Sequence, residues 1–208
     1  MIDYLVIVPI SYLLGSIPFG LIAGKLLRSV DIREHGSGNT GMTNVLRTVG
    51  RPAAALVLAL DMGKTVLAVV IARLASDSSG VEVAAALTVL LGHNWPVFVS
   101  FRGGRGTASA WGGLLILSPI SGLVALVVGV PLIAITRYVS LGSITAATFG
   151  ALALIVLAAA GHHPLVYTWF GVIGGVLVVV RHRDNIQRLI RGTERKLGQR
   201  VDLAADGN

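Results

Sequence analysis

The sequence predicts an all-α protein that crosses a membrane about seven times. Hydrophobic residues make up 54% of the 208 residues and charged residues only 13%, whereas soluble globular chains carry roughly 25% charged residues. Six long apolar stretches follow one another, and Lys and Arg collect in only some of the loops between them. We therefore expect a single integral membrane domain over 1–208, with 201–208 as a disordered tail.

The six apolar stretches are the expected membrane-spanning elements, because about 20 apolar residues in a helix cross a bilayer. The fourth stretch is too long for one ordinary span and short for two, and Ser118 and Pro119 interrupt it where a proline can break a helix. It is expected to form two short spans or a re-entrant hairpin. The first stretch is expected to stay as an uncleaved anchor, because it lacks a basic leading region. The stretches are 4–27, 52–74, 81–101, 107–136, 143–160 and 164–180.

The distribution of Lys and Arg predicts which end of each helix faces the cytoplasm. Basic residues collect after the first and third stretches, at Arg137 and in the C-terminal region, whereas the connections 75–80 and 161–163 contain neither Lys nor Arg. Short cytoplasmic loops are the ones that accumulate these residues. Only one topology places every basic loop on the same side. It has seven helices, the N-terminus outside and the C-terminus in the cytoplasm.

Several chemistries are excluded by residues that the sequence lacks. There is no cysteine, which removes disulfides and an acyl-enzyme on a thiol. Neither a G-x-S-x-G nucleophile elbow nor an H-E-x-x-H zinc motif occurs. None of the five histidines has an aspartate five positions later, as the H-x-x-x-x-D acyltransferases require. The histidines are scattered, so no metal site is expected.

The first cytoplasmic loop, 33–47, is rich in glycine. Gly36, Gly38 and Gly41 allow backbone N–H groups to approach an anion, and a helix starting near Thr43 would direct its positive end to the same place. No strand precedes the loop, so a dinucleotide-binding fold is not supported. The alternative interpretation is a flexible loop without a ligand.

Two further loops on the same face, 92–107 and 181–194, repeat this combination of glycine, base and amide. Glycines around Arg105 suit a phosphate held by backbone amides and a guanidinium. The alternative is that the arginines only mark topology or touch anionic lipid. In the third loop, a helix would place Asn185 on one face with Arg181 and with His182. The alternative there is a basic amphipathic helix lying on an anionic leaflet.

Asp61 and Lys64 lie within the second stretch at helical spacing i, i+3. Either charge alone would cost roughly 2.5–3.5 kcal/mol at the centre of a membrane. Mutual pairing lowers that cost, so we expect a structural ion pair.

Three motifs, one in each of the loops 33–47, 92–107 and 181–194, resemble the signature of the bacterial membrane acyltransferases that use acyl phosphate to acylate glycerol 3-phosphate. The similarity runs from about residue 14 to residue 194. Arg105 departs from the family, which usually has lysine there, and Thr40 and Met42 replace more usual aliphatic and small residues. Arginine keeps the charge and adds a planar fork. The matching residues are Gly36-Ser37-Gly38-Asn39 with Thr43-Asn44-Val45-Leu46-Arg47, then Gly92-His93 with Gly103-Gly104-Arg105-Gly106, and Arg181-His182 with Asn185-Ile186, Arg188-Leu189 and Gly192-Thr193-Glu194.

The resemblance implies a seven-helix monomer in the bacterial inner membrane, with its active site facing the cytoplasm. Its reaction would convert acyl phosphate and glycerol 3-phosphate into 1-acyl-glycerol 3-phosphate (lysophosphatidic acid) and phosphate, the first step of phosphatidic acid synthesis. The two substrates and membrane lipid are the expected partners, and nucleic acid is not. The family is not known to need coenzyme A, acyl carrier protein, a metal or another cofactor.

Site residues follow from the resemblance and from the chemistry of the loops. The expected catalytic residues are Ser37, His182 and Asn185. The expected phosphate-binding residues are Arg47, Gly103, Gly104, Arg105 and Gly106, and the acyl-phosphate loop is expected to include Gly36, Gly38 and Asn39. The expected structural residues are Glu194, Asp61 and Lys64.

The expected mechanism requires little covalent chemistry from the protein, because acyl phosphate is a reactive mixed anhydride. Ser37 and nearby N–H groups would polarise the carbonyl, and the proton would pass to His182 or to a phosphate oxygen. A covalent acyl group on Ser37 is a third alternative, but no His-Asp relay adjoins it in sequence. The rival class, a transporter or channel for an anionic solute, explains the charges. It does not explain why Ser, His and Asn gather on one face.

Overall fold

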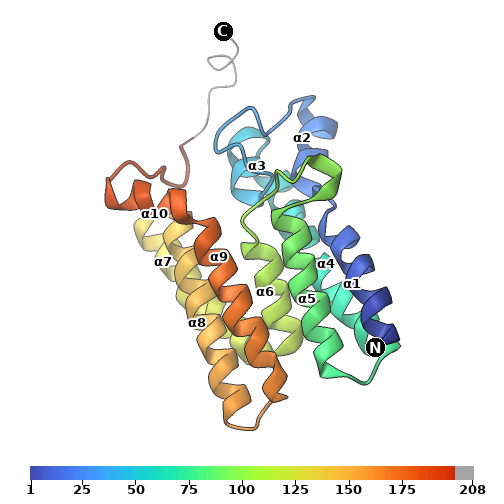
Figure 1. Ribbon diagram of the computed structural model, residues 1–208. Coiled ribbons are helices and arrows are strands. Elements are labelled where there is room, and N and C mark those ends of the chain that lie inside the picture. Colours follow the sequence, from blue (N-terminus) through green and yellow to red (C-terminus); the bar gives the residue numbers. More distant parts are fainter. Residues whose placement is uncertain (200–208) are drawn as a thin grey trace.

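The computed structural model describes residues 1–199, and these residues form a helical bundle without a strand. The helices pack side by side, with loops at both ends (Figure 1). The predicted all-α class is confirmed. The predicted disordered tail, 201–208, lies outside the described residues. In chain order the α-helices are α1 Ile2–Gly15, α2 Phe19–Arg28, α3 Met42–Thr48, α4 Arg51–Ala75, α5 Ser79–Asn94, α6 Thr107–Leu117, α7 Pro119–Thr136, α8 Val139–Ala159, α9 Gly175–Arg181 and α10 Arg183–Ile190.

Five segments in the described part of the chain are long and apolar enough to cross a membrane. Leu165–Arg181 and Arg183–Ile190 form a bent pair that adds a sixth segment. α6 is also apolar but is shorter than these segments. The last span begins with a 3₁₀ turn, Leu165–Tyr167, and a π-helical turn, Phe170–Gly174, before α9. The protein is therefore a multi-pass membrane protein. The count of seven crossings and the direction of insertion stay predictions.

The first apolar stretch is broken into two helices. α1 ends at Gly15 and α2 begins at Phe19, directly after Pro18. Proline has no N–H to donate, so the last carbonyl groups of α1 lack their usual helical partners. This break leaves the Gly15 carbonyl oxygen free for a side chain from another helix.

The fourth stretch forms two helices that meet at Ser118. Pro119 occupies the first position of α7, where its missing N–H costs nothing, and the Ser118 side chain accepts a hydrogen bond from the Ser121 amide. Hydrogen bonds place Ser109 beside Asp61 and Ile116 beside Arg73, so α6 follows α4 in the same direction. α7 then returns against α8. The sequence correctly predicts that 107–136 cannot be a single helix.

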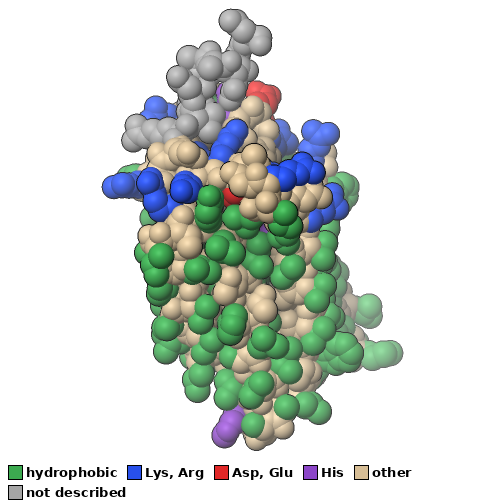
Figure 2. Space-filling model, turned by 90° about the vertical axis from the view of Figure 1, so that its left-hand side faces the viewer, with side chains coloured by type: hydrophobic (Ala, Val, Ile, Leu, Met, Phe, Trp, Pro, Cys, Tyr) green, Lys and Arg blue, Asp and Glu red, His purple; other side chains and the backbone are tan. Residues whose placement is uncertain are grey.

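All the basic loops meet at one end of the bundle. Figure 2 shows Lys and Arg side chains in a band at this end, above sides covered by hydrophobic side chains. The guanidinium of Arg137 donates to the Leu197 carbonyl, and that of Arg181 donates to the Gly104 carbonyl. The opposite end carries the contact between Asp3 and Ser76. The charge pattern therefore groups the loops correctly.

Close helix packing depends on small residues. Gly112 of α6 faces the backbone of α4, and a Cβ added there would lie 2.5 Å from the Met62 carbonyl oxygen. Neighbouring core side chains from four different elements include Val69, Leu114, Leu154 and Phe170. Helices in a lipid bilayer gain little from hydrophobic transfer, so this tight contact is a main source of association.

Gly112→Ala is therefore expected to lower the thermal unfolding midpoint in detergent. Because the clash involves backbone, α4 and α6 must move apart, and a loss of about 1–3 kcal/mol is typical of overpacking. Gly63→Ala, on the exposed face of α4 with nothing near its added Cβ, is the matched control. Alanine favours a helix over glycine by about 1 kcal/mol, so this control should match or exceed the wild type. Equal midpoints for the two variants would contradict the packing argument.

Candidate active site

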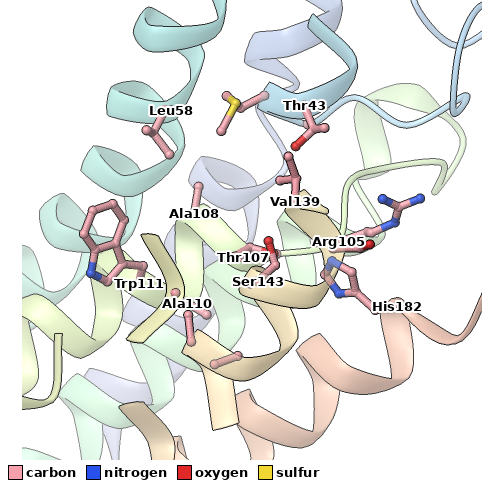
Figure 3. A pocket seen from close by; sticks show the side chains of 18 of the residues that line it. Thr43, Leu58, Arg105, Thr107, Ala108, Ala110, Trp111, Val139, Ser143 and His182 are labelled. Atoms are coloured by element: carbon pink, nitrogen blue, oxygen red, sulfur yellow. The ribbon is translucent and has the colours of Figure 1, made fainter. Parts of the chain in front are cut away.

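A cavity of about 230 Å³ lies beneath the basic end of the bundle. Its walls come from the loop before α3, from α3, α4 and the end of α5, from the loop before α6, from α6, α7 and α8, and from the segment after α9 (Figure 3). Arg105 and His182 lie at one side of it, and Leu58 and Trp111 lie at the other. The cavity is therefore polar at the end near the loops and apolar between the helices. The predicted site residues that line it are Ser37, Asn39, Arg47, Asp61, Arg105, Gly106, His182, Asn185 and Glu194.

The first motif folds around the buried side chain of Asn44. Its Oδ1 accepts from the Ser37 amide at 3.0 Å, and its Nδ2 lies 2.7 Å from the Ile32 carbonyl oxygen and 3.0 Å from that of Asn39. An amide suits this position because it offers both a donor and an acceptor to the backbone. Sequence reasoning did not select Asn44, although it stands within the first motif.

Gly36 and Gly38 shape this loop without lining the cavity, whereas Gly41 lies at the cavity wall. Gly36 and Gly38 have φ values of 65° and 68°, a region that residues with a Cβ rarely adopt. These turns place Ser37 and Asn39 at the cavity wall instead. Neither glycine is among the lining residues. Their observed part in the predicted acyl-phosphate loop is to form its turns.

The Ser37 hydroxyl makes no hydrogen bond to another group within residues 1–199. His93 and His182, the histidines at the cavity wall, make no hydrogen bond to it within residues 1–199, so it lacks the activating base that a serine nucleophile has. Its free hydroxyl is suited to donating a hydrogen bond to a substrate oxygen.

Two arginines supply the positive charge at the polar end. Burial, with the charge of Arg188 adding to it, lowers the pKa of Arg105 to about 10. Arg105 stays a cation at neutral pH, yet it has no hydrogen bond or ion pair inside the part of the chain that is described. Burial also lowers the pKa of Arg47, whose guanidinium lies 3.4 Å from the Arg195 carbonyl oxygen. Half-buried guanidinium groups of this kind favour an anion between them.

Gly103 and Gly104 occupy a different position from the one predicted. They lie outside the cavity lining and cover the side chain and carbonyl of His93. The Gly104 amide donates to the His93 carbonyl at 3.0 Å, and a Cβ on Gly104 would overlap the imidazole. Their phosphate-binding role is therefore not supported by their placement, because close packing already requires glycine here. Arg105 and Gly106 remain at the wall.

The third motif is folded over the cavity. The chain bends by 55° between α9 and α10, and α10 ends at Ile190, so 181–194 is not a single continuous helix. Beyond α10 the chain turns back, and the Glu194 carboxylate accepts hydrogen bonds from Ser140, Asn185 and Arg188 at 2.7–2.8 Å. Arg181 ties this motif to the second by donating to the Gly104 carbonyl.

The two polar residues of the third motif have defined hydrogen-bonding roles. His182 Nδ1 lies 2.8 Å from the Val178 carbonyl oxygen, which can only accept, so Nδ1 carries the proton and Nε2 keeps a free lone pair. Asn185 donates its amide to Glu194, and its buried Oδ1 has no partner in residues 1–199. Both side chains thus offer acceptors, which suit a hydroxyl better than a phosphate.

Asp61 and Lys64 form the predicted ion pair at 2.8 Å, and both are buried. The Lys64 ammonium also lies 3.0 Å from the Gly15 carbonyl oxygen and 2.8 Å from His93 Nδ1. Asp61 and His93 line the cavity, whereas Lys64 does not. Sequence reasoning missed His93, because its link to Lys64 joins two helices that are far apart in the chain.

No cluster of three or more His, Asp or Glu side chains that could hold a metal ion occurs in the part of the chain that the structure describes.

A multi-pass helical protein with a cavity that is basic at one end and apolar at the other has the form of a membrane enzyme for lipid-linked, phosphorylated substrates. The family model described as glycerol-3-phosphate acyltransferase matches residues 5–192. The chain therefore belongs to the glycerol-3-phosphate acyltransferase family and is an acyltransferase.

Individual relatives agree with this assignment. The chain is 45% identical to a glycerol-3-phosphate acyltransferase of Thermoanaerobacter pseudethanolicus, with 93% of this chain and 96% of that protein covered. It is 46% identical to one from Halalkalibacterium halodurans, with 92% and 94% covered. It is also similar to crystal structures of PlsY (YgiH), an integral membrane glycerol 3-phosphate acyltransferase. The glycerol 3-phosphate form has a TM-score of 0.86 at 40% identity, covering 94% of this chain and 96% of that one. The lysophosphatidic acid form has a TM-score of 0.84 at 39% identity, covering 94% and 95%.

The Glu194 contacts predict a defined loss of stability in acid. Burial opposes the charge of this carboxylate, but hydrogen bonds from Asn185, Ser140 and Arg188 outweigh burial and lower the pKa of Glu194 below its ordinary value. A lowered carboxylate pKa stabilises the folded state above the unfolded pKa, about 4.3, and this contribution is lost as the pH falls below it. Glu194→Gln should therefore unfold at a lower temperature than the wild type at pH 7, with the difference shrinking below about pH 4.

Thermal unfolding in detergent at several pH values measures this difference. Glu34→Gln, at an exposed position in the first loop, is the matched control and should follow the wild type throughout. A gap between Glu194→Gln and wild type that is the same at pH 7 and in acid would contradict the charge-based explanation.

Proposed function

We propose that this protein transfers a fatty acyl group from acyl phosphate to the C1 hydroxyl of glycerol 3-phosphate, releasing lysophosphatidic acid and inorganic phosphate. The observation that carries the proposal is Arg105, a half-buried cation that has no hydrogen bond or ion pair within residues 1–199 and lies at the wall of a cavity that continues between apolar helices. The family membership and the substrate and product named for PlsY support it.

The polar end of the cavity suits two phosphorylated substrates. Arg47 of α3 and Arg105 of the loop before α6 provide the positive charge. Two phosphates held together would repel each other in water, so fixed guanidinium groups also serve to bring the reacting atoms close. In this arrangement the acyl chain lies along the apolar wall, which includes Leu58, Trp111, Leu114, Leu126 and Ile133.

The acyl transfer itself breaks one bond and forms another. The C1 hydroxyl oxygen attacks the acyl carbon, and the bond from that carbon to the phosphate oxygen breaks, so phosphate leaves with the electron pair. Ser37 donates to the carbonyl oxygen, where negative charge develops. The hydroxyl proton passes to His182 Nε2, which has a free lone pair, or to an oxygen of a bound phosphate. Asn185 Oδ1 orients a glycerol hydroxyl by accepting from it.

We place the protein in the bacterial inner membrane as a monomer, with this cavity open to the cytoplasm. The gathering of Lys and Arg at the same end as the cavity supports this orientation, since short cytoplasmic loops accumulate these residues. In that orientation, water-soluble glycerol 3-phosphate reaches the polar end and acyl phosphate reaches the apolar end from the bilayer.

Purified protein in detergent tests the function directly. Supplied with palmitoyl phosphate, it is expected to release inorganic phosphate at a high rate only when glycerol 3-phosphate is present, with lysophosphatidic acid formed in equal amount. Phosphate measured colorimetrically and lipid product measured by mass spectrometry provide the two readouts. No acceptor-dependent release, beside an active control enzyme of the family, would refute the proposal.

Arg105→Ala is expected to reduce kcat/KM by about 100-fold, because charge-assisted hydrogen bonds from a guanidinium are worth roughly 1.5–3 kcal/mol each. Arg102→Ala is the matched control. Arg102 lies in the same loop but is exposed and does not line the cavity, so its loss should change kcat/KM less than about threefold. Equal losses in both variants would mean that the loop acts only through its general positive charge.

A further inference from the structure

We propose that His93 is a further substrate-binding residue of this site, a neutral imidazole whose Nε2–H donates to an anionic substrate oxygen beside Arg105. Lys64 and Asp61 act as positioning residues that hold His93 in this tautomer. The proposal rests on the proposed function and adds a residue to its cavity. His93 lines the cavity and is only 7% exposed, and Gly104, the residue before Arg105, covers its ring.

The first step of the argument is the hydrogen bonding of Lys64. An ammonium group has three N–H donors and no acceptor. Three acceptor positions surround this one, at 2.8 Å for Asp61 Oδ1, 3.0 Å for the Gly15 carbonyl oxygen and 2.8 Å for His93 Nδ1. Asp61 and the Gly15 carbonyl can only accept. All three protons of Lys64 are thus used when His93 Nδ1 accepts the third.

The second step fixes the proton on the imidazole. Nδ1 accepts from Lys64, so it carries no hydrogen, and a neutral ring must then carry its proton on Nε2. A doubly protonated His93 would place an N–H donor 2.8 Å from an ammonium that cannot accept. A proton on Nδ1 would instead have to use Asp61 Oδ1, which is farther away, at 3.3 Å.

The third step places Nε2 beside the loop that carries Arg105. A Cβ on Gly104 would meet Nε2 before any other atom, so this nitrogen faces the second motif. No hydrogen bond from Nε2 to a protein group is formed within residues 1–199. His93 also lines the cavity, so a ligand oxygen there is the acceptor that we assign to this unpaired donor.

The two histidines at this cavity therefore have opposite hydrogen-bonding roles. His182 keeps Nδ1–H on the Val178 carbonyl and offers a lone pair at Nε2. His93 accepts at Nδ1 and offers a proton at Nε2. One is suited to receiving the proton of the attacking hydroxyl, and the other to holding a phosphate oxygen.

Nitrogen NMR of the full-length protein in detergent tests the tautomer. Histidine labelled with ¹⁵N is used, and His93→Gln assigns the His93 resonances. At pH 7 we expect the pattern of a neutral Nε2–H imidazole, and we expect Lys64→Met to convert part of the population to Nδ1–H. A wild-type His93 that is doubly protonated or Nδ1-protonated would overturn the proposal. This measurement requires no turnover, so it stands even if the enzyme's substrates differ from those proposed.

The same labelled wild-type protein tests substrate contact. Saturating glycerol 3-phosphate, or a non-hydrolysable acyl phosphonate, is expected to shift the His93 Nε2 resonance, and the probe that does so identifies which phosphate His93 holds. An unchanged resonance with both probes would show that His93 does not contact substrate.

Kinetics separate binding from a merely structural role. His93→Phe removes the donor and is expected to raise the KM of one substrate by about 10- to 100-fold, as expected for a lost hydrogen bond to a charged group, with a smaller change in kcat. His93→Gln, which can present an amide N–H near the same place, should recover part of this loss. His162→Gln, at an exposed position in the loop after α8 and away from the cavity, is the control and should behave as wild type.

Outcomes for the two proposals are distinguishable. Acceptor-dependent phosphate release by the wild type, together with unchanged KM values in a folded His93→Phe, would refute the role of His93 and leave the proposed function intact. If His93→Phe unfolds, the folded His93→Gln variant replaces it in the kinetic test. KM values equal to those of the wild type in His93→Gln, together with a wild-type His93 resonance that neither probe shifts, would also refute the role of His93. Failure of the wild type to release phosphate would refute the function itself.

Discussion

The buried hydrogen bonds between Lys64 and its three acceptors fix the position of the polar site relative to the membrane helices. Lys64 comes from α4, the Gly15 carbonyl from the end of α1, and His93 from the end of α5. Each charge of the Asp61–Lys64 pair would cost several kcal/mol if left alone at membrane depth. Because the partners come from three helices, a shift of any one of them would leave a buried group unsatisfied. The break after α1 is part of this arrangement, since it frees the carbonyl that Lys64 uses.

Packing and chemistry are coupled in the second motif. The sequence Gly103-Gly104-Arg105-Gly106 has the composition of a phosphate-binding loop, yet the first two glycines pack on His93, and Gly106 has a positive φ of 79°. Only Arg105 contributes a charge to the wall. The glycines bring the loop close to the helix end, where Arg105 is half-buried. Glycine content in this loop therefore reports a close approach of backbone and side chain.

Sequence patterns predicted those features that depend on local composition. Apolar length gave the helices, Ser118-Pro119 gave the break between α6 and α7, and the positions of Lys and Arg grouped the loops at one end. The i, i+3 spacing predicted the Asp61–Lys64 pair. Contacts between distant segments were not predictable in this way. Asn44 organises its loop through four backbone groups, and neither its partners nor the 55° bend after α9 has a local sequence signal.

The bend after α9 changes how the third motif must be understood. A straight helix would place Asn185 and Arg188 beside Arg181, as a basic stripe suited to lipid headgroups. With the bend, Glu194 returns over the cavity and accepts from both Asn185 and Arg188. Glu194 neutralises the positive charge of Arg188. It also accepts the amide N–H of Asn185, so Asn185 Oδ1 is left without a hydrogen-bond partner in residues 1–199. A carboxylate at this position would repel an anionic ligand if it were unpaired. Its three hydrogen-bond donors offset that charge, so the anion-binding character of the wall depends on the fold of this short segment.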